Sequence, residues 1–231
     1  MMNQPQEDAR YMEKINLNAS DVPAQQASAE PIRVLQVFAR LNRGGAESML
    51  MSLYRSMDKS KVQFDFVANK TTDKYAFQQE ITEMGGRIYY VPRYKIYNHF
   101  PYQRAWRKLL ANHPEWHIIH AHHTVPALIY FKAAKKYGIM TIAHSHSANR
   151  NKSLKVRLRV YFCGKMVAIS DRKLACSREA GKWMFGQHNF VVLNNGINIS
   201  RYIFNAAERE AVRQSLQLED CQLVGHFGRF F

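Results

Sequence analysis

Short apolar runs alternate with longer helical patterns along most of this 231-residue chain. The first run, residues 32–38, reads IRVLQVF and is followed by a helical pattern over 46–57. A strand followed by a helix and another strand needs a crossover connection, which places the strands parallel in one sheet. The alternation therefore predicts an α/β fold with a Rossmann-like parallel sheet flanked by helices. Further strands are predicted at 64–68, 88–91, 118–121, 140–143, 167–169 and 190–193, and the helices between them at 75–84, 101–111, 125–137, 154–163 and 171–185.

Both ends of the chain depart from this alternation. The first residues are polar and poor in aromatic side chains, as in disordered segments. Beyond Asn194, Asn195 and Gly196, which favour a turn, a short helix over 208–216 precedes an apolar strand over 223–227. The predicted divisions are a disordered N-terminal tail at 1–31, the Rossmann-like domain at 32–195, an interdomain connection at 196–217, and the first strand of a truncated C-terminal domain at 218–231.

Positive charge is concentrated in the middle of the chain. The formal net charge is +15, and between residues 84 and 170 fifteen basic residues stand against one acid, Glu115. Such a field attracts an anionic partner, which leaves nucleic acid, an acidic lipid surface or a phosphorylated substrate open. A solvated basic surface without a partner is the alternative interpretation.

Composition excludes several other classes. The longest clean apolar run, 125–131, is far shorter than the roughly 20 residues of a membrane-spanning helix. Cys163, Cys176 and Cys221 show no CxxC spacing, so neither a disulfide framework nor a zinc finger is predicted. We therefore expect a reducing, cytoplasmic location.

A glycine pair, Gly44 and Gly45, lies between the first predicted strand and the first helix. Glycines allow the backbone to approach a ligand closely, and a helix N-terminus offers free N–H groups to a phosphate. The loop matches neither the GxGxxG dinucleotide pattern nor the GxxxxGK[ST] phosphate loop, which disfavours nicotinamide binding and nucleotide hydrolysis. A tight turn without a ligand is the alternative.

Histidines gather at the ends of two predicted strands, where ligands of open parallel sheets bind. We expect neutral imidazoles that hydrogen-bond a sugar hydroxyl or a phosphate. The more specific alternative is a metal centre, because imidazole is a common metal ligand. This stretch supplies no accompanying carboxylate or thiolate, so no metal is predicted. Packing alone remains an alternative for at least three of the five. These are His120, His122 and His123 after one strand, and His144 and His146 after another.

Two stretches mix basic and aromatic residues, 93–108 and 150–161. This mixture suits nucleic acid or a membrane interface. Because no RNA-binding or helix-turn-helix signature accompanies it, we favour the membrane surface and expect no nucleic-acid partner. The residues predicted to face the membrane or a lipid-linked acceptor are Arg150, Lys152, Lys155, Arg157 and Arg159.

Six segments in order resemble the retaining family-4 glycosyltransferases of the GT-B fold, in particular enzymes of capsular and exopolysaccharide assembly. The resemblance covers roughly residues 32–231. Its segments are IRVLQVF with GGAES, IIHAHHT, IAHSHS, ACSREAGKWMFG, VLNNGI and LVGHFGRF.

The resemblance implies two Rossmann-like domains that face each other across a cleft, with this chain supplying the N-terminal, acceptor-side domain. It implies transfer of a hexosyl-type sugar from a nucleotide-diphosphate sugar, with retention and with neither a metal nor another cofactor. By the same resemblance, Gly44 and Gly45 approach the donor diphosphate and Arg229 pairs with it. His122 or its neighbour His123 contacts the transferred sugar. His144 and His146 line the cleft.

The resemblance also sets limits. The family has a lysine shortly after the GRF segment and a pair of spaced glutamates later, and the sequence contains neither. We therefore expect residues 1–231 alone to be inactive or nearly so. Lipid-linked acceptors imply a cytoplasmic protein held peripherally at the inner membrane face. The alternatives are a basic nucleic-acid-binding module, a GT-B epimerase acting on nucleotide sugars, and a metal hydrolase.

Overall fold

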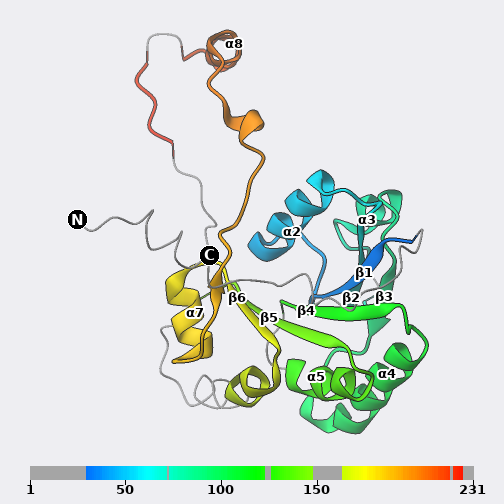
Figure 1. The fold of residues 1–231 in the computed structure, drawn as a ribbon. Helices are drawn as coiled ribbons and strands as arrows, with labels where there is room; N and C mark the ends of the chain where they lie inside the picture. The colour runs from blue at the N-terminus through cyan, green and yellow to red at the C-terminus, as the bar shows by residue number, and fades with distance from the viewer. Residues whose placement is uncertain (1–29, 72, 123–125, 148–162, 219–220, 226–231) are drawn as a thin grey trace.

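The computed structural model describes residues 30–225, with gaps at residue 72 and at 123–125, 148–162 and 219–220 (Figure 1). Its centre is one seven-stranded sheet in which every neighbouring pair of strands is parallel. The predicted Rossmann-like α/β class is therefore confirmed. The strands, in the spatial order β3-β2-β1-β4-β5-β6-β7, are β1 (Ile32–Val37), β2 (Val62–Asn69), β3 (Ile88–Val91), β4 (Trp116–Ala121), β5 (Met140–Ser145), β6 (Arg172–Ala175) and β7 (Val191–Val192).

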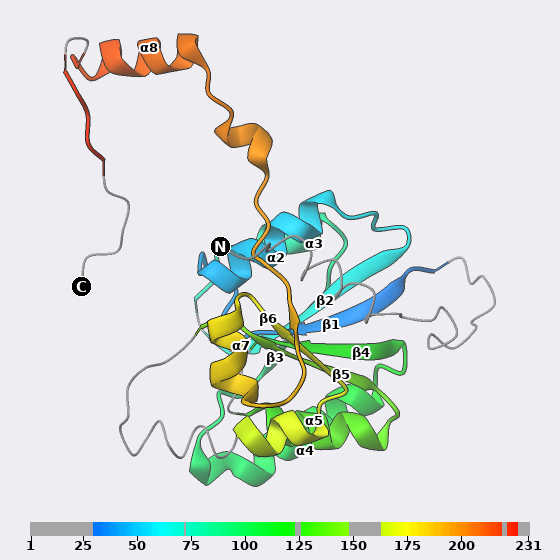
Figure 2. The same cartoon turned by 60° about the vertical axis from the view of Figure 1, so that its left-hand side comes forward.

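Helices cover both faces of the sheet, as Figures 1 and 2 show. One apolar layer packs α2 and α3 against β1 and β2, and a second packs α4, α5 and α7 on the opposite face. Strand β2 serves both layers by alternation, because Phe66 belongs to the first and Val67 to the second. The helices are α2 (Gly45–Ser56), α3 (Gln78–Glu83), α4 (His99–Ala111), α5 (Ala127–Lys136), α7 (Arg178–Phe185) and α8 (Ala206–Ser215), with short 3-10 turns η2 (Ile96–Asn98) and η3 (Ile199–Tyr202).

The chain reverses its direction of travel across the sheet between β1 and β4. From β1 it adds β2 and β3 on one side, and then returns to place β4 and the later strands on the other. The loops that leave β1 and β4 therefore diverge at the carboxyl edge, which is where open α/β sheets bind ligands.

One predicted strand and part of one predicted helix are wrong. Residues 163–169, which include the predicted strand 167–169, are helical. The buried residues of this segment recur every three to four positions, which is the spacing of a helix and not of the predicted strand. They are Cys163, Met166, Val167 and Ser170.

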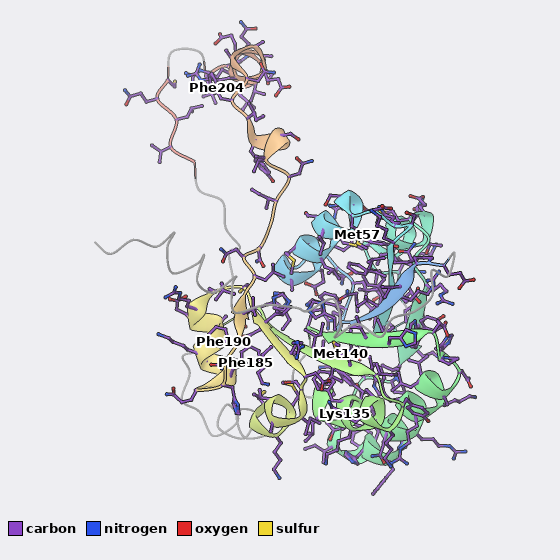
Figure 3. All side chains as sticks on the ribbon, in the orientation of Figure 1. Met57, Lys135, Met140, Phe185, Phe190 and Phe204 are labelled. Atoms are coloured by element: carbon purple, nitrogen blue, oxygen red, sulfur yellow. The ribbon has the colours of Figure 1, made fainter. Side chains whose placement is uncertain are left out.

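The sixth strand instead lies inside the predicted helix 171–185. Strand β6 precedes α7, and Ser177 separates them by accepting a hydrogen bond from the Ala180 N–H at 3.1 Å as the helix N-cap. At the other end of α7, Phe185 and Phe190 lie side by side, with ring centroids 5.7 Å apart (Figure 3). A Cβ atom at Gly181 would collide with the Phe190 ring, so glycine is required for this packing.

Beyond β7 the chain leaves the sheet. Helix α8 lies away from the sheet and has no buried residue in the structure (Figure 2). Of the predicted strand 223–227, residues 223–225 show no strand, and the remainder lies outside the described residues. The domain boundaries, including the tail at 1–31, therefore stay predictions. In the described part of the chain, no helix is both long and apolar enough to cross a bilayer.

Candidate functional site

Four histidines meet at the carboxyl ends of β4 and β5, and we call them the imidazole cluster: His120, His122, His144 and His146. Neighbouring ring centroids are 4.0 to 5.4 Å apart. Gln36 of β1 pairs in register with both Phe66 of β2 and His120 of β4, so these residues share the face that carries α2 and α3. The apolar layer under α2 and α3 contains no residue from β4 or β5. On the β4 and β5 side of β1, the imidazole cluster occupies this face of the sheet in place of apolar side chains.

Hydrogen bonds fix the protonated nitrogens of two of the rings. His122 Nε2 lies 2.9 Å from Gln36 Oε1, and an amide oxygen only accepts, so Nε2 donates. His122 Nδ1 then accepts from His146 Nε2 at 2.7 Å. Neutral His146 consequently carries a bare Nδ1, and this buried atom has no hydrogen-bond partner in the structure. The Phe38 ring stacks on His122 at 4.2 Å and holds its plane.

The second pair of rings leaves another buried nitrogen free. His120 Nε2 and His144 Nδ1 share a hydrogen bond of 3.1 Å. His144 is 1% exposed, and its Nε2 makes no hydrogen bond within the described structure. A buried polar atom without a partner costs free energy, which an incoming hydroxyl or phosphate oxygen can recover.

The cluster is neutral at pH 7. Burial, reinforced by the neighbouring imidazoles, lowers the pKa of His120 to about 3 and the pKa of His144 to about 2. Burial alone lowers the pKa of His146 to about 4, and burial with three imidazole neighbours holds the pKa of His122 well below its usual range. The site therefore offers N–H donors and lone pairs and carries no charge of its own.

Three of these residues can approach a metal ion. His120, His122 and His144 each place one nitrogen within 4.8 Å of the others. In the described residues, no carboxylate or thiolate completes this set. Both nitrogens of His122 are already hydrogen-bonded, so a metal would have to displace His146 or Gln36. The expected absence of a metal stays a prediction.

The glycine pair begins α2, but its surroundings differ from the simple phosphate loop. Gly44 is the N-cap, and its N–H is bonded to Asn42 O at 2.8 Å. The Glu47 carboxylate folds back against Gly44, and burial raises the pKa of this carboxyl. Gly45 lines a cavity of about 260 Å³ together with residues 195–198. Glu47 and residues 195–198 were not among the residues predicted for the site.

The structure brings together only part of the predicted site. His122, His144 and His146 converge, and Gly44 and Gly45 start a helix on the same face of the sheet. Gln36 and Phe38 join them unpredicted. The remaining predicted residues, His123, Arg229, Arg150, Lys152, Lys155, Arg157 and Arg159, lie outside the described residues, and their roles stay predictions.

The model of Glycosyltransferase Family 4 matches residues 43–201, which is most of the described domain. The chain belongs to this family. EpsF of Bacillus subtilis (strain 168), a relative named as a glycosyltransferase, is 34% identical over 209 residues, which cover 86% of this chain and 54% of EpsF. The family-4 chain thus spans about half the length of this curated relative.

Solved structures share its fold. HepE of Anabaena, crystallised with UDP and with UDP-glucose, matches with a TM-score of 0.64 at 17% identity, over 86% of this chain and 53% of HepE. A glycosyltransferase of Rickettsia africae matches with a TM-score of 0.60 at 14% identity, over 81% of this chain and 50% of its own. The seven-stranded sheet is therefore the Rossmann-like unit of the GT-B fold.

Proposed function

We propose that the protein takes part in transfer of a hexosyl-type sugar from a nucleotide-diphosphate sugar to a lipid-linked acceptor in exopolysaccharide or capsule synthesis. The observation that carries the proposal is the neutral imidazole cluster at the carboxyl edge of a family-4 domain. The similarity to EpsF and the UDP complexes of HepE support the nucleotide-sugar donor. Transfer proceeds with retention and without a metal, at the inner face of the membrane.

The chemistry demands groups that bind a sugar without adding charge beside it. The transition state places positive charge on the sugar ring and negative charge on the leaving diphosphate. A protonated imidazole next to the ring would oppose that positive charge, and burial keeps these imidazoles neutral. His144 Nε2 and His146 Nδ1 are free to bond ligand atoms, and the bare His146 Nδ1 accepts from a sugar hydroxyl. The negative charge is met, outside the described residues, by Arg229, and by the α2 N-terminus where the Glu47 carboxylate leaves it uncovered.

The reaction is tested by expressing the gene's complete reading frame and supplying radiolabelled UDP-sugars with a polyprenyl-diphosphate-linked saccharide. We expect a labelled glycolipid whose new bond keeps the anomeric configuration of the donor, and an unchanged rate in EDTA. NMR of the product reads the configuration. An inverted product would contradict retention, EDTA inhibition would contradict metal independence, and release of label only as free sugar would contradict transfer.

Replacement of His122 tests the cluster itself. We expect His122→Ala to lower kcat/KM of this transferase by about 10²-fold, because His122 accepts the His146 Nε2–H and so positions the His146 ring whose Nδ1 binds the sugar. His188→Ala removes an exposed histidine that is not part of the cluster and is the matched control. Steady-state kinetics are compared at equal folded fraction, measured by thermal unfolding. A loss below about fivefold, which is about 1 kcal/mol, would remove His122 from the reaction.

A further inference from the structure

A second polar cavity opens at the carboxyl ends of β1, β2 and β3, next to the imidazole cluster. Its volume is about 500 Å³. Four cationic side chains line it, and Asp73 is the only carboxylate among its described lining residues. We call it the cationic pocket, and its cations are Arg40, Lys70, Lys74 and Arg93.

Three separate loops bring these cations together. Arg40 follows β1, Lys70 follows β2 and Arg93 follows β3. Backbone hydrogen bonds tie the loops to one another, from the Asn69 N–H to Ala39 O at 3.2 Å and from the Lys70 N–H to Val91 O at 2.7 Å. The cations therefore converge because the strands end at one edge of the sheet.

Several basic residues elsewhere in the domain are held by a counter-charge, and the pocket cations are not among them. Arg33 and Arg87 pair with Asp65, Arg55 with Glu80, and Lys135 with Asp171. Within the described part of the chain, none of the four pocket cations makes an ion pair. Like charges gathered around one cavity repel each other, and a bound anion removes that cost.

We propose that the cationic pocket binds the phosphate or diphosphate group of the acceptor. Guanidinium groups bind phosphate oxygens bidentately, and lysine ammonium groups add compact positive charge. The cavity volume suits a diphosphate with part of the attached saccharide. This inference rests on the proposed function for the identity of the acceptor, whereas anion binding stands on the pocket alone.

The cationic pocket lies next to the imidazole cluster along the chain. The ring of Phe38 stacks on His122, and the next two residues, Ala39 and Arg40, line the pocket. An acceptor held here by its phosphate thus extends its saccharide toward the imidazole cluster, where the transferred sugar is expected. The pocket would set which end of the acceptor enters the site.

Binding is measured on the 231-residue chain by calorimetric titration with inorganic pyrophosphate. We expect one pyrophosphate per chain and about tenfold or greater weakening in the double variant Lys70→Gln/Lys74→Gln, which loses two charge-assisted contacts. The matched control, Lys132→Gln/Lys136→Gln, removes the same charge from exposed positions on α5 and should leave binding unchanged. All four lysines are exposed, so both variants should keep the thermal stability of the parent chain.

Sedimentation with vesicles identifies the source of the anion. Recruitment to phosphatidylcholine vesicles that contain a polyprenyl diphosphate, reversed by pyrophosphate, supports a lipid-linked acceptor. Pyrophosphate binding without such recruitment supports a soluble sugar phosphate.

Three results would overturn the proposal: no pyrophosphate binding, equal weakening in the two double variants, or competition by single-stranded RNA that the pocket variant does not weaken. None of these measurements uses a sugar donor, so failure of the transferase assay leaves the binding result independent.

Discussion

The folded domain should lose most of its stability between pH 6.5 and about pH 5, well above the range in which carboxyl groups titrate. The cause is the imidazole cluster, whose four members are neutral when folded and free to take up protons when unfolded. The lowered pKa of buried Asp65 acts only below its ordinary value of 3.8, so it contributes nothing in this window.

The sign of this pH dependence follows from the numbers of protons that the folded and the unfolded states bind. Each histidine has a folded pKa below the ordinary 6.5, so below pH 6.5 the unfolded state binds more protons, and stability falls as the pH is lowered. One such group costs about 1.4 kcal/mol per pH unit, and four cost about 5.5 kcal/mol per unit. A domain with an ordinary stability of about 5–10 kcal/mol therefore reaches its unfolding midpoint at about pH 4.5 to 5.5.

Urea denaturation at a series of pH values, followed by the fluorescence of the buried Trp106 and Trp116, measures this slope. The double variant His120→Gln/His144→Gln removes two of the titrating groups and should roughly halve the slope. His188→Gln, which changes an exposed histidine, should leave it unaltered. Stability that stays constant from pH 7 to pH 5 would show that the cluster is hydrated or protonated in the folded protein.

Replacing Asp65 with alanine should destabilise the domain by about 3–5 kcal/mol, the cost of breaking a buried ion pair from one side. The Asp65 carboxylate is 0% exposed and lies at the amino-terminal side of the sheet, where it binds groups from three other strands or loops. It accepts hydrogen bonds from Arg33 at 2.7 Å, from Arg87 at 2.6 Å and from Trp116 Nε1 at 2.8 Å.

Burial opposes ionisation of Asp65, but hydrogen bonds from Arg87 and Trp116, with the charge of Arg33, outweigh burial and hold the pKa of this carboxyl below its usual range. Without the carboxylate, the indole N–H of Trp116 is buried with no acceptor. Arg33 also loses its counter-charge, whereas Arg87 keeps Glu115 at 2.9 Å. The loss thus combines an unpaired donor with an uncompensated cation.

Chemical denaturation at pH 7 measures this effect. Asp65→Asn keeps the shape of the side chain and one acceptor oxygen. Its free energy of unfolding should therefore lie between those of the parent and of Asp65→Ala. Asp73→Ala removes an exposed carboxylate and should change stability by less than about 0.5 kcal/mol. A loss below about 1 kcal/mol in Asp65→Ala would mean that the network is solvated.

Local pattern explains which predictions were accurate. The apolar runs at 32–38 and 64–68 are short and are carried by neighbouring residues alone, so these strands were predictable. The secondary structure of residues 163–175 was predicted wrongly, because such short apolar runs fit a strand and a helix equally well. Only packing against the rest of the domain selects one of the two. The location of His122 and His144 at strand ends was predictable for the same local reason.

The sequence by itself determined the α/β class, the placement of the histidines at strand ends and the basic character of the chain, because each depends on residues close together along the backbone. Only the tertiary structure decided that Gln36 accepts the His122 N–H, that Glu47 covers Gly44, and that Arg40, Lys70 and Arg93 share one cavity. Gln36 and His122 are 86 residues apart, and the pocket cations come from three loops. Contacts between residues so far apart in the sequence follow from the order of strands in the sheet, and that order is set by the packing of the whole domain.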